Sequence, residues 1–121
     1  MISLSEQIYG ILKTISDAKQ VSFFYPQSWA ELPAVTFYEQ QNQEYARVDN
    51  GHEYLTEVAY QVDIWAKTPE DCLRIAAQVN DKLREIGLKR EFAADLYDNG
   101  IHHKTIRFGG LVQPDTERIY Q

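Results

Sequence analysis

The 121-residue sequence predicts a single α+β domain in which two helices pack on one face of a mostly antiparallel sheet. Apolar side chains recur with helical spacing in residues 4–18 and 69–86, whereas residues 55–66 alternate apolar and polar side chains as a half-buried strand does. Along the chain the predicted elements follow the order α-β-β-β-α-β-β. A chain of this length favours one domain, assigned to residues 1–121 with a polar C-terminal tail at 113–121.

The N-terminal part is expected to contain one helix and two strands. A stripe of isoleucine and leucine predicts the helix over residues 4–18, with Ser3 or Ser5 as its N-cap. Apolar and aromatic residues predict short strands at 21–25 and 34–40, each bounded by a proline.

Residues 41–54 are mostly polar and contain a turn signal, because Asn50 and Gly51 tolerate a positive φ. This pattern is typical of either the long arm of a hairpin or a mobile loop. The strand that follows, at 55–66, has one apolar face and one face of mixed polarity. The mixed face is expected to be partly solvated or used for contact. It carries Gln61, Asp63 and Trp65.

The second helix has the clearest boundaries. Thr68 suits the N-cap, Pro69 the first helical position, and Asp71 the third position in a variant of the capping box. Gly87 suits the C-terminal cap, where a left-handed residue is favoured. Cys72 falls on the apolar stripe of this helix, so we interpret it as a small core residue rather than a reactive thiol.

Two further strands are predicted at 88–98 and 102–112. One extra residue in their connection would pair Phe92 with Phe108 and so match two apolar faces. The sequence therefore predicts a three-residue or bulged connection at 99–101 rather than a two-residue Asn-Gly turn.

Composition and charge exclude several classes of function. The net charge of −6, with no basic footprint, disfavours binding to nucleic acid. A single cysteine excludes an intrachain disulfide and a cysteine-rich zinc site, and fits a reducing cytoplasm. The sequence has no signal-peptide pattern, no membrane-spanning apolar run, and no phosphate-binding, dinucleotide-binding or nucleophile-elbow motif. We therefore expect no cofactor, no membrane partner and no enzymatic activity.

The three histidines, His52, His102 and His103, are the remaining candidates for metal or catalytic chemistry. Adjacent residues on a strand point to opposite faces, so His102 and His103 are not expected to share a metal. One of them could join His52 and Asp98 or Asp95 in a site, but polar residues at a turn are the favoured interpretation.

Asp63 is the only acidic residue in a mostly apolar run of its strand. If it is buried it needs a partner, because an isolated charge is costly to bury. A position on the surface or in a subunit interface is the favoured interpretation, and catalysis is the least favoured.

The passage Tyr60–Asp71, which reads YQVDIWAKTPED, resembles the strand-then-helix passage of the tail-terminator and tail-completion proteins of long-tailed bacteriophages. In that family the helix ends in an L-x-x-(I/L)-G pattern, which Leu83–Gly87 matches. The stretch from Tyr97 to Gly110 is similar to the closing hairpin of the family. The resemblance covers nearly the whole chain in element order and includes no catalytic motif.

The resemblance implies a structural role in virion assembly. Such proteins form a ring, commonly of six subunits, on the head-proximal end of the tail tube, where the ring stops polymerisation. The implied partners are further copies of the chain, the major tail-tube protein and a head-completion or neck protein. The implied location is the tail or neck of the virion, after assembly in the host cytoplasm. The candidate assembly surface comprises Gln61, Asp63, Trp65, Glu44, Tyr45, Arg47 and Asp49.

Two alternative functions remain open. A neck or head-completion connector protein differs from a tail terminator only in its partner. A small ligand- or peptide-binding module needs a concave apolar pocket with a few convergent polar groups. A pocket that holds Asp63 together with one of the histidines would favour such a module or an enzyme.

Overall fold

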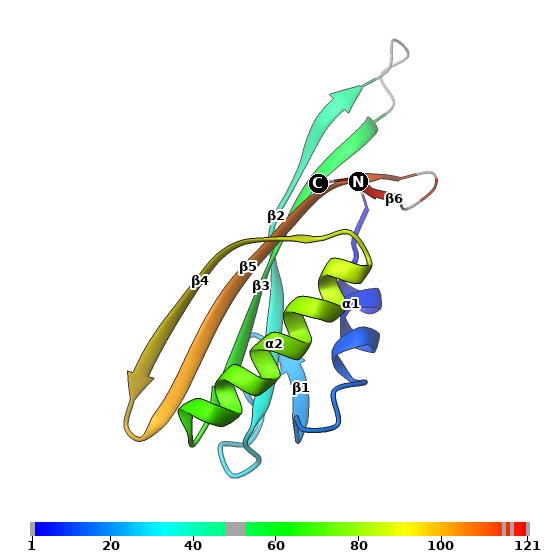
Figure 1. The fold of residues 1–121 in the computed structure, drawn as a ribbon. Coiled ribbons are helices and arrows are strands. Elements are labelled where there is room, and N and C mark those ends of the chain that lie inside the picture. The colour runs from blue at the N-terminus through cyan, green and yellow to red at the C-terminus, as the bar shows by residue number, and fades with distance from the viewer. Residues whose placement is uncertain (1, 48–52, 115, 117, 121) are drawn as a thin grey trace.

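The computed structural model describes residues 2–47, 53–114, 116 and 118–120. Its elements follow the predicted order with one additional strand at the C-terminal end (Figure 1). The predicted α+β class is therefore confirmed. The elements are α1 (Ser5–Leu12), β1 (Gln20–Phe23), β2 (Ala34–Arg47), β3 (Glu53–Ala66), α2 (Pro69–Glu85), β4 (Lys89–Asp98), β5 (Ile101–Gln113) and β6 (Arg118–Tyr120).

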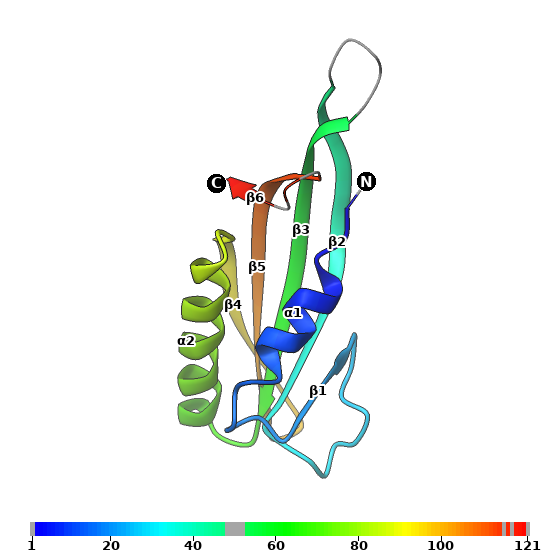
Figure 2. The ribbon, with the colours of Figure 1, turned by 90° about the vertical axis from the view of Figure 1, so that its right-hand side faces the viewer.

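The strands form one sheet in the order β1-β2-β3-β5-β4, and β6 pairs with β5. Strand β1 is parallel to β2, and the other pairings in the described part of the chain are antiparallel. Helices α1 and α2 lie along the same face of this sheet (Figure 2), so the opposite face, which we call the open face, has no helical cover. The polar C-terminal tail is not wholly outside the sheet, because residues 118–120 form β6.

The core lies between the helices and the face of the sheet that they cover. Tyr60 is central to it: its hydroxyl accepts a hydrogen bond from the backbone N of Leu4 (2.8 Å) and donates one to Glu39 Oε1 (3.0 Å). Burial raises the pKa of the Tyr60 phenol. These bonds hold the start of α1 on the sheet. The other large buried side chains include Ile8, Leu12, Phe37, Ile64, Ile75, Leu83 and Phe108.

Helix α2 begins and ends as predicted. Thr68 Oγ1 accepts a hydrogen bond from the backbone N of Asp71 (3.2 Å), and Pro69 is the first helical residue. Gly87 follows the C-terminal end with a φ of 105°. These caps place the apolar stripe of α2 over β3 and β5.

Helix α1 is shorter than predicted, because it ends at Leu12. The prediction that Ser3 or Ser5 caps it was also wrong, since Leu4 occupies the N-cap position without a side-chain cap hydrogen bond. Ile15 continues the apolar pattern beyond the helix and is buried in the core from the connection that follows α1. The pattern therefore indicated burial rather than helix length. No helix in the described part of the chain is both long and apolar enough to cross a membrane.

The connection between β4 and β5 differs from the prediction. Asn99 and Gly100 form a two-residue turn with φ angles of 51° and 82°, and Phe92 lies opposite Arg107 rather than Phe108. The predicted three-residue or bulged connection was therefore wrong. A two-residue hairpin turn that follows the twist of the sheet needs positive φ at both positions, and an Asn-Gly pair adopts it at low cost.

Apolar matching did not set this register, because most side chains of β4 are exposed on both faces. An extra residue between Arg90 and Phe92 makes a bulge in β4. Phe92 lies opposite Arg107 on one side of this bulge, and Arg90 lies opposite Phe108 on the other. The bulged residue is Glu91, and a Cβ added to Gly109 would lie 2.7 Å from its carboxylate. Gly109 therefore leaves room for Glu91 to lie over the open face.

Strands β2 and β3 extend beyond the rest of the sheet as a two-stranded arm (Figure 1). Pairing of β3 with β5 reaches only to Thr56, whereas pairing of β3 with β2 continues to Arg47 and Glu53. Of the two alternatives for residues 41–54, the described part therefore supports the arm of a hairpin. Residues 48–52, which include the predicted turn, lie outside the described residues.

Candidate functional site

The open face brings together three of the predicted assembly residues and separates them from the others. Gln61, Asp63 and Trp65 alternate along β3 with core residues, and their side chains point to the open face. Glu44 and Tyr45 lie on the arm, where both are exposed. Arg47 is the last residue of β2, and Asp49 lies outside the described residues.

Asp63 is almost completely buried, with 3% of its surface exposed. Its Oδ1 lies 2.7 Å from His103 Nε2, and its Oδ2 accepts a hydrogen bond from Gln61 Nε2 (3.0 Å). The expected position on the surface was therefore wrong, because Asp63 is buried within the subunit, and the partner that such burial requires is His103. Local sequence patterns do not indicate this partner, because the pairing of β3 with β5 that places Trp65 opposite His103 joins distant parts of the chain.

Trp65 holds His103 in place by stacking. The two ring centroids lie 3.7 Å apart at an interplanar angle of 15°. The indole Nε1 of Trp65 donates a hydrogen bond to Thr36 Oγ1 (2.9 Å), and two rings from the loop between β1 and β2, those of Tyr25 and Trp29, contact the indole. These contacts fix the indole and leave the Asp63–His103 pair little freedom to move.

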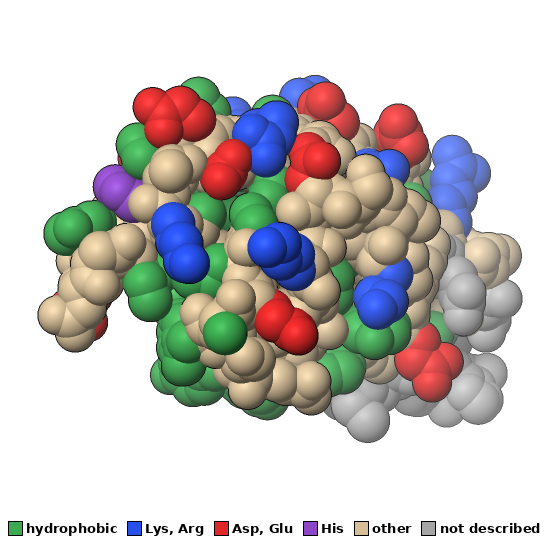
Figure 3. All heavy atoms as spheres, turned by 90° about the horizontal axis from the view of Figure 1, so that it is seen from below, with side chains coloured by type: hydrophobic (Ala, Val, Ile, Leu, Met, Phe, Trp, Pro, Cys, Tyr) green, Lys and Arg blue, Asp and Glu red, His purple; other side chains and the backbone are tan. Residues whose placement is uncertain are grey.

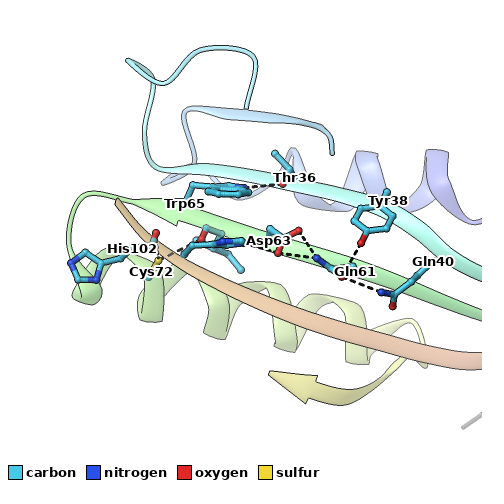
Figure 4. Close-up of polar contacts among 10 residues, drawn as sticks. Thr36, Tyr38, Gln40, Gln61, Asp63, Trp65, Cys72 and His102 are labelled. Atoms are coloured by element: carbon cyan, nitrogen blue, oxygen red, sulfur yellow. Dashed lines mark hydrogen bonds and ion pairs between the residues drawn. The ribbon is translucent and has the colours of Figure 1, made fainter. Parts of the chain in front are cut away.

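Gln61 extends the polar cluster toward β2 (Figure 4). Its Oε1 accepts hydrogen bonds from the Tyr38 hydroxyl (2.9 Å) and from Gln40 Nε2 (3.1 Å). Gln40 Oε1 in turn accepts a hydrogen bond from Arg107, whose guanidinium also pairs with Glu91 (3.0 Å). A chain of polar contacts thus crosses the open face from β2 to β4.

Two hollows share the Trp65–His103 stack. The first, which we call the aromatic hollow, has a volume of about 290 Å³. It is lined by Phe24, Tyr25, Tyr38, Gln61, Asp63, Trp65 and His103. The second has a volume of about 350 Å³ and is otherwise lined by Trp29, Leu96, Tyr97, Asp98 and Ile101. The aromatic hollow meets the condition set for a binding module, since it holds Asp63 together with a histidine.

A strained turn supplies two walls of the aromatic hollow. Phe24 has a φ of 66°, a left-handed conformation that a bulky side chain rarely adopts. The turn is held by a hydrogen bond from the backbone N of Tyr25 to Phe23 O (2.8 Å) and by one from Ser22 Oγ to Tyr25 O (2.9 Å). Both of these side chains face solvent, since Phe24 is 56% and Tyr25 68% exposed.

Exposed hydrophobic side chains gather at the end of the molecule opposite the arm. Seen from that end, they reach the surface between acidic and basic side chains (Figure 3). Soluble monomers seldom expose many large apolar groups together, and aromatic residues are enriched in protein interfaces. The exposed set that lines the two hollows comprises Phe24, Tyr25, Trp29, Leu96 and Tyr97.

In the described part of the chain, no Ser, Thr or Cys side chain is hydrogen-bonded to His103, and no three His, Cys, Asp or Glu residues lie together as metal ligands. His102 contacts the Tyr97 ring, with centroids 4.8 Å apart, while its neighbour His103 binds Asp63. His52 lies outside the described residues.

Cys72 is a buried free thiol on α2, as its place on the apolar stripe predicted. Its Sγ donates to the backbone oxygen of His102 (3.3 Å), and burial raises the pKa of the thiol.

Only the thiolate reacts rapidly with alkylating reagents. We therefore expect iodoacetamide to modify Cys72 about tenfold or more slowly in the native protein than in urea, as followed by mass spectrometry. Equal rates in the two states would contradict the buried position.

Two comparisons with known proteins were made for the chain. The sequence matches no protein-family model. A search of curated proteins finds no significant match.

Proposed function

We propose that this protein is a structural, non-enzymatic tail-terminator protein of a long-tailed bacteriophage. In this proposal it caps the head-proximal end of the tail tube as a ring and forms part of the surface to which the head is joined. The resemblance centred on Tyr60–Asp71 supports the family. The observation that carries the assembly role is the open face, where Gln61, Asp63 and Trp65 lie beside a group of exposed aromatic side chains.

A ring requires two different surfaces on each subunit, because a head-to-tail contact closes on itself only when unlike patches meet. The described subunit has unlike regions at its two ends: a mostly polar arm at one end and an aromatic surface at the other. Such asymmetry also suits a cap, because a cap has to bind the last tube ring on one side and must not bind a further tube subunit on the other. The partners in this proposal are those that the resemblance implies: further copies of this chain, as a hexamer, the major tail-tube protein and a head-completion protein.

Electron microscopy of purified protein mixed with polymerising tail-tube protein tests this function. We expect tubes that are shorter than those formed by tube protein alone, with a ring at one end. Tubes of unchanged length, with no ring, would contradict the proposal.

A pair of variants tests whether the open face is the assembly surface. Tyr25→Lys places a charge beside the aromatic hollow, whereas Leu73→Lys places the same charge on α2, on the other side of the sheet. Tyr25 is 68% and Leu73 63% exposed, so both variants are expected to fold. We expect Tyr25→Lys to need about tenfold more protein to cap the tubes, and Leu73→Lys to behave as the wild type. Equal effects of the two would contradict the use of the open face.

A second candidate function is favoured by one observation, the presence of Asp63 and His103 in the same hollow. A small peptide-binding module would use such a hollow for a single anchoring side chain. A neck or head-completion connector remains an alternative that differs in its partner. The capping experiment separates both from a terminator, because neither would shorten the tail tube.

A further inference from the structure

Strand β4 forms a free edge of the sheet (Figure 1). It pairs with β5 on one side and with no described strand on the other. All of its residues except Ala94 are exposed, and they include three large apolar side chains, those of Phe92, Leu96 and Tyr97. The free edge of a strand carries unpaired backbone N–H and C=O groups. The edge of β4 is therefore open to pairing with a further strand.

The opposite edge of the sheet is less suited to pairing. There β1 is short and covers only residues Gln20–Phe23. The part of β2 beyond β1 has register shifts between residues 39 and 41 and between residues 44 and 46. Short strands and bulges protect the edges of natural sheets against pairing. In β4, by contrast, the register with β5 is regular over residues 92–98.

The hairpin turn determines which backbone groups of β4 face the free edge. The residues that flank a two-residue turn form a hydrogen-bonded pair, and here these are Asp98 and Ile101. Hydrogen-bonded and non-hydrogen-bonded pairs alternate along an antiparallel ladder, so every second residue of β4 directs its N–H and C=O groups to β5. The residues between them direct these groups outward, and they are Ala93, Asp95 and Tyr97.

An antiparallel second copy of β4 fits this edge in one register. With Ala94 opposite Ala94 of the second copy, the outward groups of Ala93 meet those of Asp95. The same register places Phe92 opposite Leu96, so two pairs of apolar side chains meet on the open face. A shift by one residue would set outward groups against inward ones. Centring the pairing on Asp95 would bring two carboxylates together.

The charges of β4 favour the same antiparallel arrangement. The strand begins with Lys89 and Arg90 and ends with Asp98. Among the described residues, no ion pair engages Lys89 or Asp98. Antiparallel pairing brings the basic start of each strand beside the acidic end of the other, twice in one dimer. Opposite charges across paired strands are stabilising, and like charges are destabilising.

We infer that two copies of this protein pair through the outer edges of β4 as an antiparallel dimer. A two-fold contact uses the same patch on both copies and closes at two subunits, whereas a ring needs unlike patches. The dimer is therefore a form of the protein outside the proposed ring, and the inference does not rest on the proposed function. A single strand edge is a small contact, so we expect a dissociation constant on the order of 100 µM and a monomer in dilute solution.

Analytical ultracentrifugation of the full chain tests the pairing. We expect a monomer at about 10 µM and mostly dimer at about 1 mM. Ala93→Pro removes an outward N–H at an edge position that tolerates proline, and it should abolish the dimer. Ala93→Ser keeps this N–H and should dimerise as the wild type does. A wild type that stays monomeric, or an Ala93→Pro variant that dimerises equally well, would overturn the inference.

Two charge variants test the antiparallel direction. Lys89→Asp and Asp98→Lys each place like charges across the contact twice, so each variant alone should dimerise about tenfold more weakly. An equimolar mixture of the two should recover the affinity of the wild type, because each variant then carries the charges that its partner needs. A mixture that pairs no better than the separate variants would overturn the inference.

Cysteine variants test the register. Ala94→Cys places two thiols across the two-fold axis, where the Cα atoms of a non-hydrogen-bonded pair lie about 4.5 Å apart, within reach of a disulfide. Oxidised glutathione should convert this variant to a covalent dimer, which a non-reducing gel detects. Ala93→Cys, whose thiol would lie opposite Asp95, is the matched control and should cross-link about tenfold or more slowly. The native Cys72 is buried and does not compete. Equal cross-linking of the two variants, or none by Ala94→Cys, would overturn the inference.

Discussion

Replacing Phe108 with alanine is expected to lower the free energy of unfolding by about 3–5 kcal/mol, because the ring is fully buried and its removal leaves a cavity between β5 and the helices. The matched control is Phe92→Ala on the neighbouring strand. Phe92 is 56% exposed, so its loss should change stability by no more than about 0.5 kcal/mol. Urea unfolding followed by circular dichroism measures both values.

This pair of variants also tests the register of the β4–β5 hairpin. The three-residue connection predicted from the sequence would place Phe92 opposite Phe108 on one apolar face, and both substitutions would then be costly. The observed turn at Asn99 and Gly100 places Phe92 opposite Arg107 on the open face. Similar losses for the two variants would therefore contradict the described structure. A typical domain has only about 5–15 kcal/mol of stability, so the difference is easily measured.

His103→Ala is expected to cost about 2–4 kcal/mol, the second largest effect. The substitution removes a stacked ring pair, worth about 0.5–1.5 kcal/mol. It also leaves the buried Asp63 carboxylate with Gln61 as its remaining side-chain donor, and an under-satisfied buried polar group costs about 1–3 kcal/mol. Thermal and urea unfolding at neutral pH measure the loss.

The neighbouring histidine provides the control for this experiment. His102→Ala removes an identical side chain from the adjacent position, where it contacts the Tyr97 ring, and should cost no more than about 1 kcal/mol. Adding Asp63→Asn to His103→Ala removes the poorly paired charge and should restore part of the stability. A double-mutant cycle is expected to give a coupling energy of about 1–2 kcal/mol between Asp63 and His103. A coupling near zero would show that the pair does not stabilise the fold.

Local sequence signals predicted the parts of the fold that depend on local physics. Thr68, Pro69 and Gly87 delimit α2, because capping is decided within a few residues by backbone hydrogen bonds and φ preferences. The alternation in β3 correctly separated a core face from a mixed face, because a strand repeats every two residues. The same alternation singled out Gln61, Asp63 and Trp65 together.

Features set by contacts distant in sequence were not predictable in this way. The buried Asp63 signalled that a partner was needed, but β3–β5 pairing across α2 and β4 determines that the partner is His103. Apolar matching failed for the β4–β5 register because it assumes a buried face, and β4 is mostly exposed. The strained Phe24 turn has no sequence signal, since a left-handed phenylalanine is imposed by its surroundings.

The order of strands in the sheet has a consequence for how a new subunit folds. Strands β2 and β3 form one hairpin and β4 and β5 form another, each joined through neighbouring sequence. The two hairpins meet only through β3 and β5, which helix α2 and strand β4 separate along the chain. Such a distant pairing must overcome loop-closure entropy before it gains contacts, so it is expected to set the folding rate. Since Asp63 on β3 and His103 on β5 meet in that same step, the aromatic hollow becomes complete only as the sheet closes, and a half-folded chain lacks it.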